Sequence, residues 1–136
     1  MSEIEIFNPA GVPRPAGTYS HVARVQPGAR LVVIAGQVAI GPDGLLVGPD
    51  DFDRQCTQAF ANLGAAIVGA GGSWASVIQT MTFLTRREDV ARLRAWRNRE
   101  YAELLPDGRY PPNTLLVVSG LADEAMLLEV QALAAI

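Results

Sequence analysis

Residues 110–114 carry the side chains best suited to hold a small ligand. The segment is Tyr-Pro-Pro-Asn-Thr, and its adjacent prolines fix the backbone and remove N–H donors just before a strand-like run. Asn113, with amide donors and an acceptor, and Thr114, with a hydroxyl, would then be presented in a defined geometry. Two interpretations are open: a polar contact site for a ligand, or a rigid loop in which Asn113 satisfies its own backbone.

Glu129 is the second candidate, because it is the only acid in the apolar run of residues 126–134. A carboxylate in an otherwise apolar strand is costly unless it is paired or has a function. Its position therefore indicates either a functional acid or a carboxylate at a sheet edge or subunit interface.

Other reactive side chains have simpler structural explanations. His21 has no second His or Cys at metal-ligand spacing, so we interpret it as a surface or strand-end residue. Cys56 falls on an apolar helical stripe, which favours a buried, inert thiol over a nucleophile. Gly69, Gly71 and Gly72 indicate a helix ending, because the Lys-Ser/Thr of a phosphate-binding loop does not follow them.

Arginines flank acidic residues between residues 86 and 103. The arginines are Arg86, Arg87, Arg92, Arg94, Arg97 and Arg99, and the acids are Glu88, Asp89, Glu100 and Glu103. Such a mixture is typical of a solvated helix face, and we favour that interpretation over an anion site.

The hydrophobic pattern predicts the elements that position these residues. Apolar residues recur every three or four positions over residues 52–70, with Asp50 or Asp51 as the N-cap, and a second helix begins at Glu88-Asp89 and ends before Pro106. In that second helix, one face would carry Val90, Leu93, Arg97, Tyr101 and Leu104. Residues 18–25 and 31–37 flank a Pro-Gly turn and predict a hairpin. Further strands are expected at residues 45–47, 77–85, 114–119 and 126–134.

Helices placed between strands imply crossovers that pack on one face of a sheet. The sequence therefore predicts an α+β domain with two helices on one face of the sheet. The other face still carries apolar residues, and self-association is the simplest way to cover them.

Length and composition limit the remaining possibilities. The 136 residues fit one domain spanning residues 1–136, and 49% hydrophobic residues suffice for a sizeable core. A net charge of −3 without a basic run argues against nucleic-acid and acidic-membrane partners. One cysteine excludes an internal disulfide, and residues 1–7 do not resemble a signal peptide. We expect a cytoplasmic protein with no metal and no cofactor.

Short motifs spread nearly end to end along the chain carry a family resemblance. They are Asn8-Pro9, Gly17-Thr18-Tyr19-Ser20, Val-Ile-Ala-Gly-Gln at 33–37, Gln55 with Asn62-Leu63, Ala70-Gly71-Gly72, Asn98 with Tyr101, Pro-Pro-Asn-Thr at 111–114, and Leu128-Glu129-Val130. Their order and spacing resemble the Rid family, also called YjgF-like, of reactive intermediate (imine/enamine) deaminases.

The resemblance implies a chorismate-mutase-like fold with a six-stranded, mostly antiparallel sheet and two helices on one face. It also implies a homotrimer with small-molecule clefts between adjacent subunits. In the deaminating members, the residue matching Glu129 positions or activates the water that attacks the imine carbon. The residue matching Tyr19 lines the cleft, and the one matching Asn98 lies near it. Ala35 stands where a serine is common.

The main departure from the family pattern is Asn113, where deaminating relatives carry an arginine that grips the substrate carboxylate. Its loss should weaken carboxylate binding by roughly tenfold to more than a hundredfold. Arg109, four residues upstream, is a candidate replacement. Otherwise a cleft with Asn113, Thr114, Tyr19 and Glu129 suits a neutral or amide-like ligand.

Two functional hypotheses follow. The first is a Rid-like enzyme that acts on a small imine, enamine or related unsaturated metabolite, with water activation or proton transfer by Glu129. The replacement at Asn113 argues against the usual hydrolysis of 2-imino acids. The alternative is a non-catalytic trimeric protein that binds small molecules.

Overall fold

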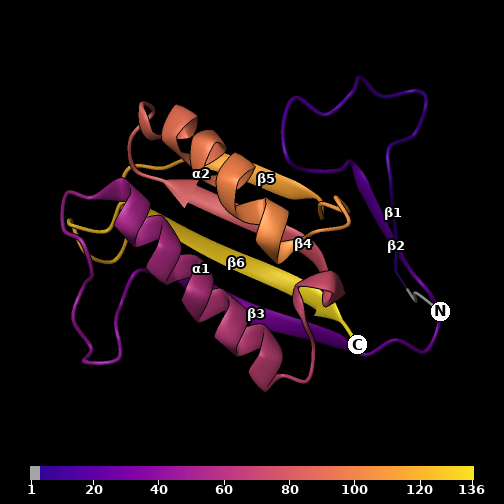
Figure 1. Cartoon of the computed structure of the whole chain (residues 1–136), viewed down its shortest axis with the longest axis horizontal. Helices are drawn as coiled ribbons and strands as arrows, with labels where there is room; N and C mark the ends of the chain where they lie inside the picture. Colours follow the sequence, from indigo (N-terminus) through magenta and orange to yellow (C-terminus); the bar gives the residue numbers. More distant parts are fainter. Residues whose placement is uncertain (1–3) are drawn as a thin grey trace.

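Residues 4–136, which the computed structural model describes, form six strands in two sheets (Figure 1). The first three residues of the segment 1–7 considered above lie outside this range. Strand β1 (Ile4–Phe7) pairs with β2 (Val22–Val25) in an antiparallel ribbon. The other strands form one sheet in the order β3-β6-β4-β5. They are β3 (Leu31–Gln37), β4 (Val77–Leu84), β5 (Asn113–Val117) and β6 (Leu128–Ala135).

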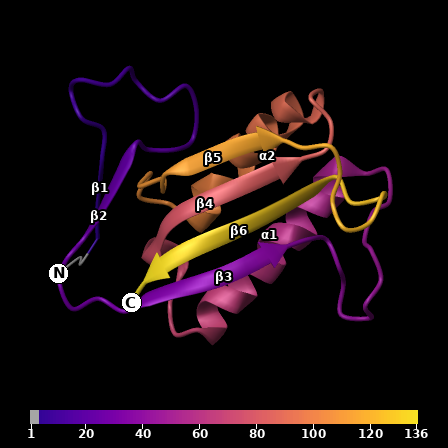
Figure 2. The ribbon, with the colours of Figure 1, turned by 180° about the vertical axis from the view of Figure 1, so that it is seen from behind.

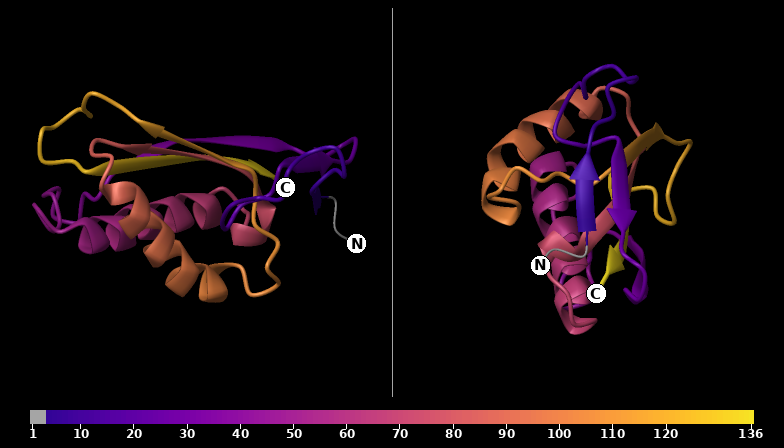
Figure 3. Two further views of the ribbon diagram at one scale, coloured as in Figure 1. Left: turned by 90° about the horizontal axis from the view of Figure 1, so that it is seen from above. Right: turned by 90° about the vertical axis from the view of Figure 1, so that its right-hand side faces the viewer.

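Both helices lie on the same face of the four-stranded sheet. Helix α1 (Phe52–Gly69) and helix α2 (Asp89–Leu104) form one layer when the sheet is seen edge-on (Figure 3, left). The view from behind shows the opposite face without a helix (Figure 2). A short 3-10 helix, η1 (Trp74–Ser76), leads into β4. The predicted α+β class, with two helices on one sheet face, is thus confirmed.

Strand pairing is mostly antiparallel, as predicted, with β4 and β5 as the parallel pair. The predicted hairpin of residues 18–25 and 31–37 is wrong. Strand β2 pairs with β1, and β3 pairs with the distant β6. The apolar alternation of β3 turns Ile34 into the core opposite Ala132 of β6, and this burial outweighs the local Pro-Gly turn signal. Residues 45–47 form only an isolated bridge, between Ile40 and Leu46.

The core lies between the sheet and α1. Asp51 begins this helix by accepting a hydrogen bond from the Arg54 N–H at 3.1 Å, and Gly71 adopts a φ of 93° just beyond its end. Cys56, Phe60 and Leu63 are buried on the inward stripe, which confirms the predicted period. Within residues 4–136, no helix is long and apolar enough to cross a bilayer.

Gln55 ties the loops around this core together. Its buried amide donates to the carbonyls of Gly48 and Ala125 at 3.2 and 2.9 Å, and its carbonyl accepts from the Leu127 N–H at 2.9 Å. The start of α1 and the start of β6 are thereby fixed to each other. Glu129 follows two residues after this anchored point.

Candidate functional site

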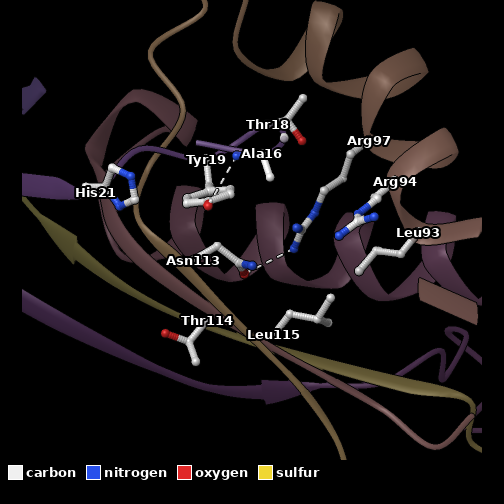
Figure 4. Close-up of a pocket in the computed structure, with 11 residues that line it drawn as sticks. Ala16, Thr18, Tyr19, His21, Leu93, Arg94, Arg97, Asn113, Thr114 and Leu115 are labelled. Atoms are coloured by element: carbon white, nitrogen blue, oxygen red, sulfur yellow. Dashed lines mark hydrogen bonds between the residues drawn. The ribbon is translucent and has the colours of Figure 1, made fainter. Parts of the chain in front are cut away.

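A cavity of about 400 Å³ lies at the edge of the sheet, where α2, the start of β5 and the loop before β2 meet. Figure 4 shows Arg97 between Tyr19 and Arg94, pointing toward Asn113. The lining residues are Ala16, Gly17, Thr18, Tyr19, His21, Leu93, Arg94, Arg97, Asn113, Thr114 and Leu115. None of these lining residues is acidic.

Arg97 reaches the cavity from the inner face of α2. Its side chain is 5% exposed, and its Nη2 donates to Thr82 Oγ1 at 2.7 Å and to Asn113 Oδ1 at 3.1 Å. The interpretation of the arginine run as a solvated face is therefore wrong for this residue. The physical reason is helical spacing, because Arg97 lies four residues from both Leu93 and Tyr101, which are buried.

The side chain of Asn113 is held by the sheet and by α2. Its Oδ1 accepts from Thr80 Oγ1 and Thr82 Oγ1, each at 2.9 Å, in addition to Arg97 Nη2. Because a guanidinium can only donate, the Asn113 atom facing it must be the oxygen. The amide orientation and the rotamer of Asn113 are therefore fixed by three side chains from two elements, β4 and α2.

Tyr19 is presented to the cavity by the loop between β1 and β2. Its hydroxyl accepts from the Ala16 N–H at 3.3 Å, and its ring meets that of His21 edge to face at 5.6 Å. The His21 N–H donates to Asn8 Oδ1 at 2.8 Å, and His21 Nε2 lies 2.7 Å from the Pro13 carbonyl. His21 thus stands directly before β2 and cross-links its own loop, in agreement with a strand-end role.

Arg109, the candidate replacement named above, does not reach the cavity. Its guanidinium donates to the main-chain carbonyl of Ile4 in β1, and it is not one of the residues lining the cavity. The cation beside Asn113 is Arg97, which comes from the helix layer and not from the strand.

Glu129 lies on the opposite side of the sheet from this cavity. Asn113 pairs with Thr80 on β4 and Glu129 pairs with Phe83, three residues further along the same strand. An odd number of steps reverses the face, and Thr80 is buried toward the helices, so Glu129 faces away from them. Glu129 is partly exposed, and a Cβ added at Gly36 would lie only 2.6 Å from its Oε2.

The structure therefore divides the predicted site residues. It brings Tyr19, Asn113 and Thr114 together around the cavity. Glu129 lies on the bare sheet face, and Ala35 is exposed on β3. Asn98 is exposed on α2 and does not line the cavity.

The main residue that the sequence interpretation missed is Arg97, together with its hydrogen-bond partner Thr82 and its neighbour Arg94. A usable signal was present. The predicted apolar face of the second helix included Arg97, and an arginine at a core position needs a polar partner inside the protein.

Comparison with known proteins places this architecture in a family. The sequence profile of the Endoribonuclease L-PSP family matches residues 10–136. The RutC family protein PH0854 of Pyrococcus horikoshii is 28% identical over 130 residues, which cover 96% of each chain.

Solved structures agree with the sequence matches. YyfB of Yersinia pestis, a protein of unknown function of the conserved Rid family, matches with a TM-score of 0.85 and 28% identity, covering 99% of this chain and 100% of that chain. E. coli TdcF, solved with bound serine, matches with a TM-score of 0.69 and 25% identity, covering 96% and 97%. These relatives define a class of small α+β proteins of the YjgF type. The chain belongs to the Rid/YjgF family, whose sequence profile is described as Endoribonuclease L-PSP.

Proposed function

We propose that this protein is a Rid-like hydrolase that acts on a small imine, enamine or related unsaturated metabolite, with Glu129 activating the water. The position of Glu129 carries the proposal. Its carboxylate lies on the bare sheet face and makes no hydrogen bond or ion pair with any of residues 4–136, and Gly36 leaves room beside it. When another subunit covers this face, a carboxylate without a partner there becomes costly, which favours a functional role over a structural one.

The proposed chemistry needs one group that can accept and return a proton. Glu129 accepts a proton from water as the water oxygen bonds to the imine carbon, and the C=N π electrons go to nitrogen, which takes that proton from Glu129 to give a carbinolamine. Glu129 then accepts the hydroxyl proton and passes it to the nitrogen. The C–N bond breaks, ammonia leaves, and the carbonyl product forms.

A homotrimer is the second part of the proposal, and the bare sheet face supports it. Large apolar side chains there are exposed in the single chain: Leu31 by 61%, Val33 by 78% and Leu116 by 39%. Exposed large apolar side chains on a sheet face that no helix covers are typical of an interface. In such an assembly, a cleft between subunits would bring the cavity of one chain toward the sheet face of another.

The alternative is a non-catalytic trimeric protein that binds small molecules, and one observation favours it. Within one chain, Asn113 and Glu129 lie on opposite faces of the sheet, so the cavity alone contains no acid that could activate water. If assembly does not bring Glu129 to the cavity, the protein binds a ligand without converting it.

Ammonia release from enzymatically generated imines of several amino acids distinguishes the two functions. We expect the wild-type chain to accelerate release and Glu129→Gln to lower the rate about a hundredfold, the low end of the range for a lost general base. Glu124→Gln, an exposed acid in the turn before β6, is the matched control and should leave the rate unchanged. No release above background with any imine would sink the hydrolase and favour the binding protein. An undiminished rate in Glu129→Gln would remove the role given to Glu129.

A further inference from the structure

Arg97 is a buried cation without a protein anion. Its side chain is 5% exposed, and its Nε has no hydrogen-bond partner. Among residues 4–136, the ion pairs use other arginines, namely Arg24, Arg86, Arg92 and Arg99. A buried charge without a counter-charge is unfavourable, so the position favours an anion from outside the chain.

The one buried acid on the same helix is already occupied. Asp89 is fully buried, and its carboxylate pairs with Arg86 Nε at 2.9 Å and Arg92 Nη1 at 2.6 Å. It lies about two turns before Arg97, in the first turn of α2. Asp89 therefore cannot neutralise Arg97.

The remaining polar groups around Arg97 are arranged as donors. Its Nη2 is held by Thr82 and Asn113, and its Cζ lies 5.7 Å from the centroid of the Tyr101 ring. Asn113 accepts three hydrogen bonds through Oδ1, which leaves its Nδ2 as a donor without a partner in that range. Arg94 adds a second positive charge to the lining. Donors and positive charge without an acid are the features of an oxyanion site.

We propose that this cavity binds the carboxylate of a small organic acid and that Arg97 holds it. The inference deepens the proposed function, on which it rests for the view that the bound molecule is the one converted. Asn113 is then a positioning residue that, with Thr80 and Thr82, orients the guanidinium. The preference for a neutral ligand expected from Asn113 is thereby reversed, because Arg97 of α2 places a cation beside Asn113.

The test compares a matched acid and amide, propionate and propionamide, titrated into the intact protein by NMR. We expect propionate to bind at least about tenfold more tightly, in line with one charge-assisted hydrogen bond. Inorganic phosphate serves as the competing oxyanion, and tighter binding of phosphate than of propionate would overturn the carboxylate assignment. Equal affinity for acid and amide would overturn the anion site itself.

Variants assign the binding to Arg97. Arg97→Gln should abolish the preference for propionate, whereas Arg99→Gln, on the exposed face of the same helix, should keep it. Because a buried arginine also supports the fold, Asn113→Asp provides an independent variant. It places a carboxylate next to Arg97 Nη2, so it should retain the melting temperature and lose propionate binding. Wild-type binding in a folded Arg97→Gln or Asn113→Asp protein would refute the proposal.

The binding result is separable from the hydrolase proposal. Propionate binding that depends on Arg97, without ammonia release, would keep the anion site and reject the hydrolase. Ammonia release without any preference for acid over amide would keep the hydrolase and reject the anion site.

Discussion

The two faces of the four-stranded sheet are built on different principles. On the helix-covered face, polar groups are bonded into a network in which Arg97, Thr82 and Asn113 hold one another. On the bare face, Val33 is 78% exposed and Glu129 has no partner among residues 4–136. On the helix-covered face, the proposed missing partner is an anion for Arg97. On the bare face, the proposed missing partner is a second subunit that covers the exposed apolar side chains.

This difference follows from strand alternation. Successive residues on a strand point to opposite faces, so an acid three pairing positions away from Asn113 cannot share its side of the sheet. A single chain therefore separates the group proposed to hold a ligand from the group proposed to activate water. If the protein is an enzyme, assembly is part of its mechanism and not only of its stability.

The largest expected effect is the loss of assembly when charge is added to the bare face. Val33→Glu would bury a carboxylate in the proposed subunit interface, which costs several kcal/mol for each ion. We expect the wild-type protein to be a trimer and the variant a monomer by light scattering at micromolar concentration, with unchanged circular dichroism.

Val68→Glu is the matched control for that experiment. Val68 is 66% exposed near the end of α1, in the helix layer, so the same substitution there should leave the trimer intact. A trimeric Val33→Glu protein, or a monomeric wild type, would contradict the assignment of the bare face as the interface.

A smaller effect is expected from Gly36, which borders the Glu129 carboxylate. A methyl group at Gly36 would lie 2.6 Å from Oε2 and 2.7 Å from Cδ of Glu129, so the flexible acid must move while the strand stays in place. We predict that Gly36→Ala lowers imine hydrolysis by about tenfold, less than the roughly hundredfold cost of a full 1 Å misplacement, and leaves the melting temperature nearly unchanged.

Gly120→Ala controls for the loss of a glycine, because no atom lies within 4 Å of the added Cβ there. Its rate should equal that of the wild type. If Gly36→Ala hydrolyses imines at the full rate, the role given to Glu129 in the reaction is contradicted.

The comparison of the two faces also shows what the sequence could predict. The inward stripe of α1, with Cys56 and Phe60, follows a strong helical period and was predicted with its cap and its glycine ending. The pairing of β2 with β1 was not predicted. The turn signal at Pro27-Gly28 is local, whereas the pairing of β3 with β6 is decided by burial between segments far apart in the sequence.

The candidate site was predicted only in part, for a related reason. Asn113 and Tyr19 were identified from residue type and motif, and both line the cavity. The role of Arg97 depends on α2 crossing above β4 and β5, a tertiary contact that no short motif records. Charge counting along the helix pointed to a solvated face, although the apolar period already placed Arg97 among buried neighbours.

The smallest expected effect is a loss of stability at high pH, which tests whether water is excluded from the core under the helices. Burial raises the pKa of the Cys56 thiol, with a further rise from the negative charge of Asp53. The folded chain therefore keeps this proton at a pH where the unfolded chain, with a thiol pKa of about 8.5, releases it. Stability is fully present below that pKa and falls as the pH rises above it, by about 1 kcal/mol at pH 9.5. The chain suits the measurement because its basic side chains other than His21 are arginines, which stay charged throughout.

Urea unfolding at pH 7.5 and 9.5 should show this loss in the wild type and a much smaller one in Cys56→Ala, whatever packing the substitution itself costs. Burial also raises the pKa of Tyr101, so the slope that remains in Cys56→Ala should steepen only near pH 10. Equal losses in both proteins would mean that water reaches the thiol. The helix-covered face would then not exclude water, which contradicts the contrast drawn between the two faces.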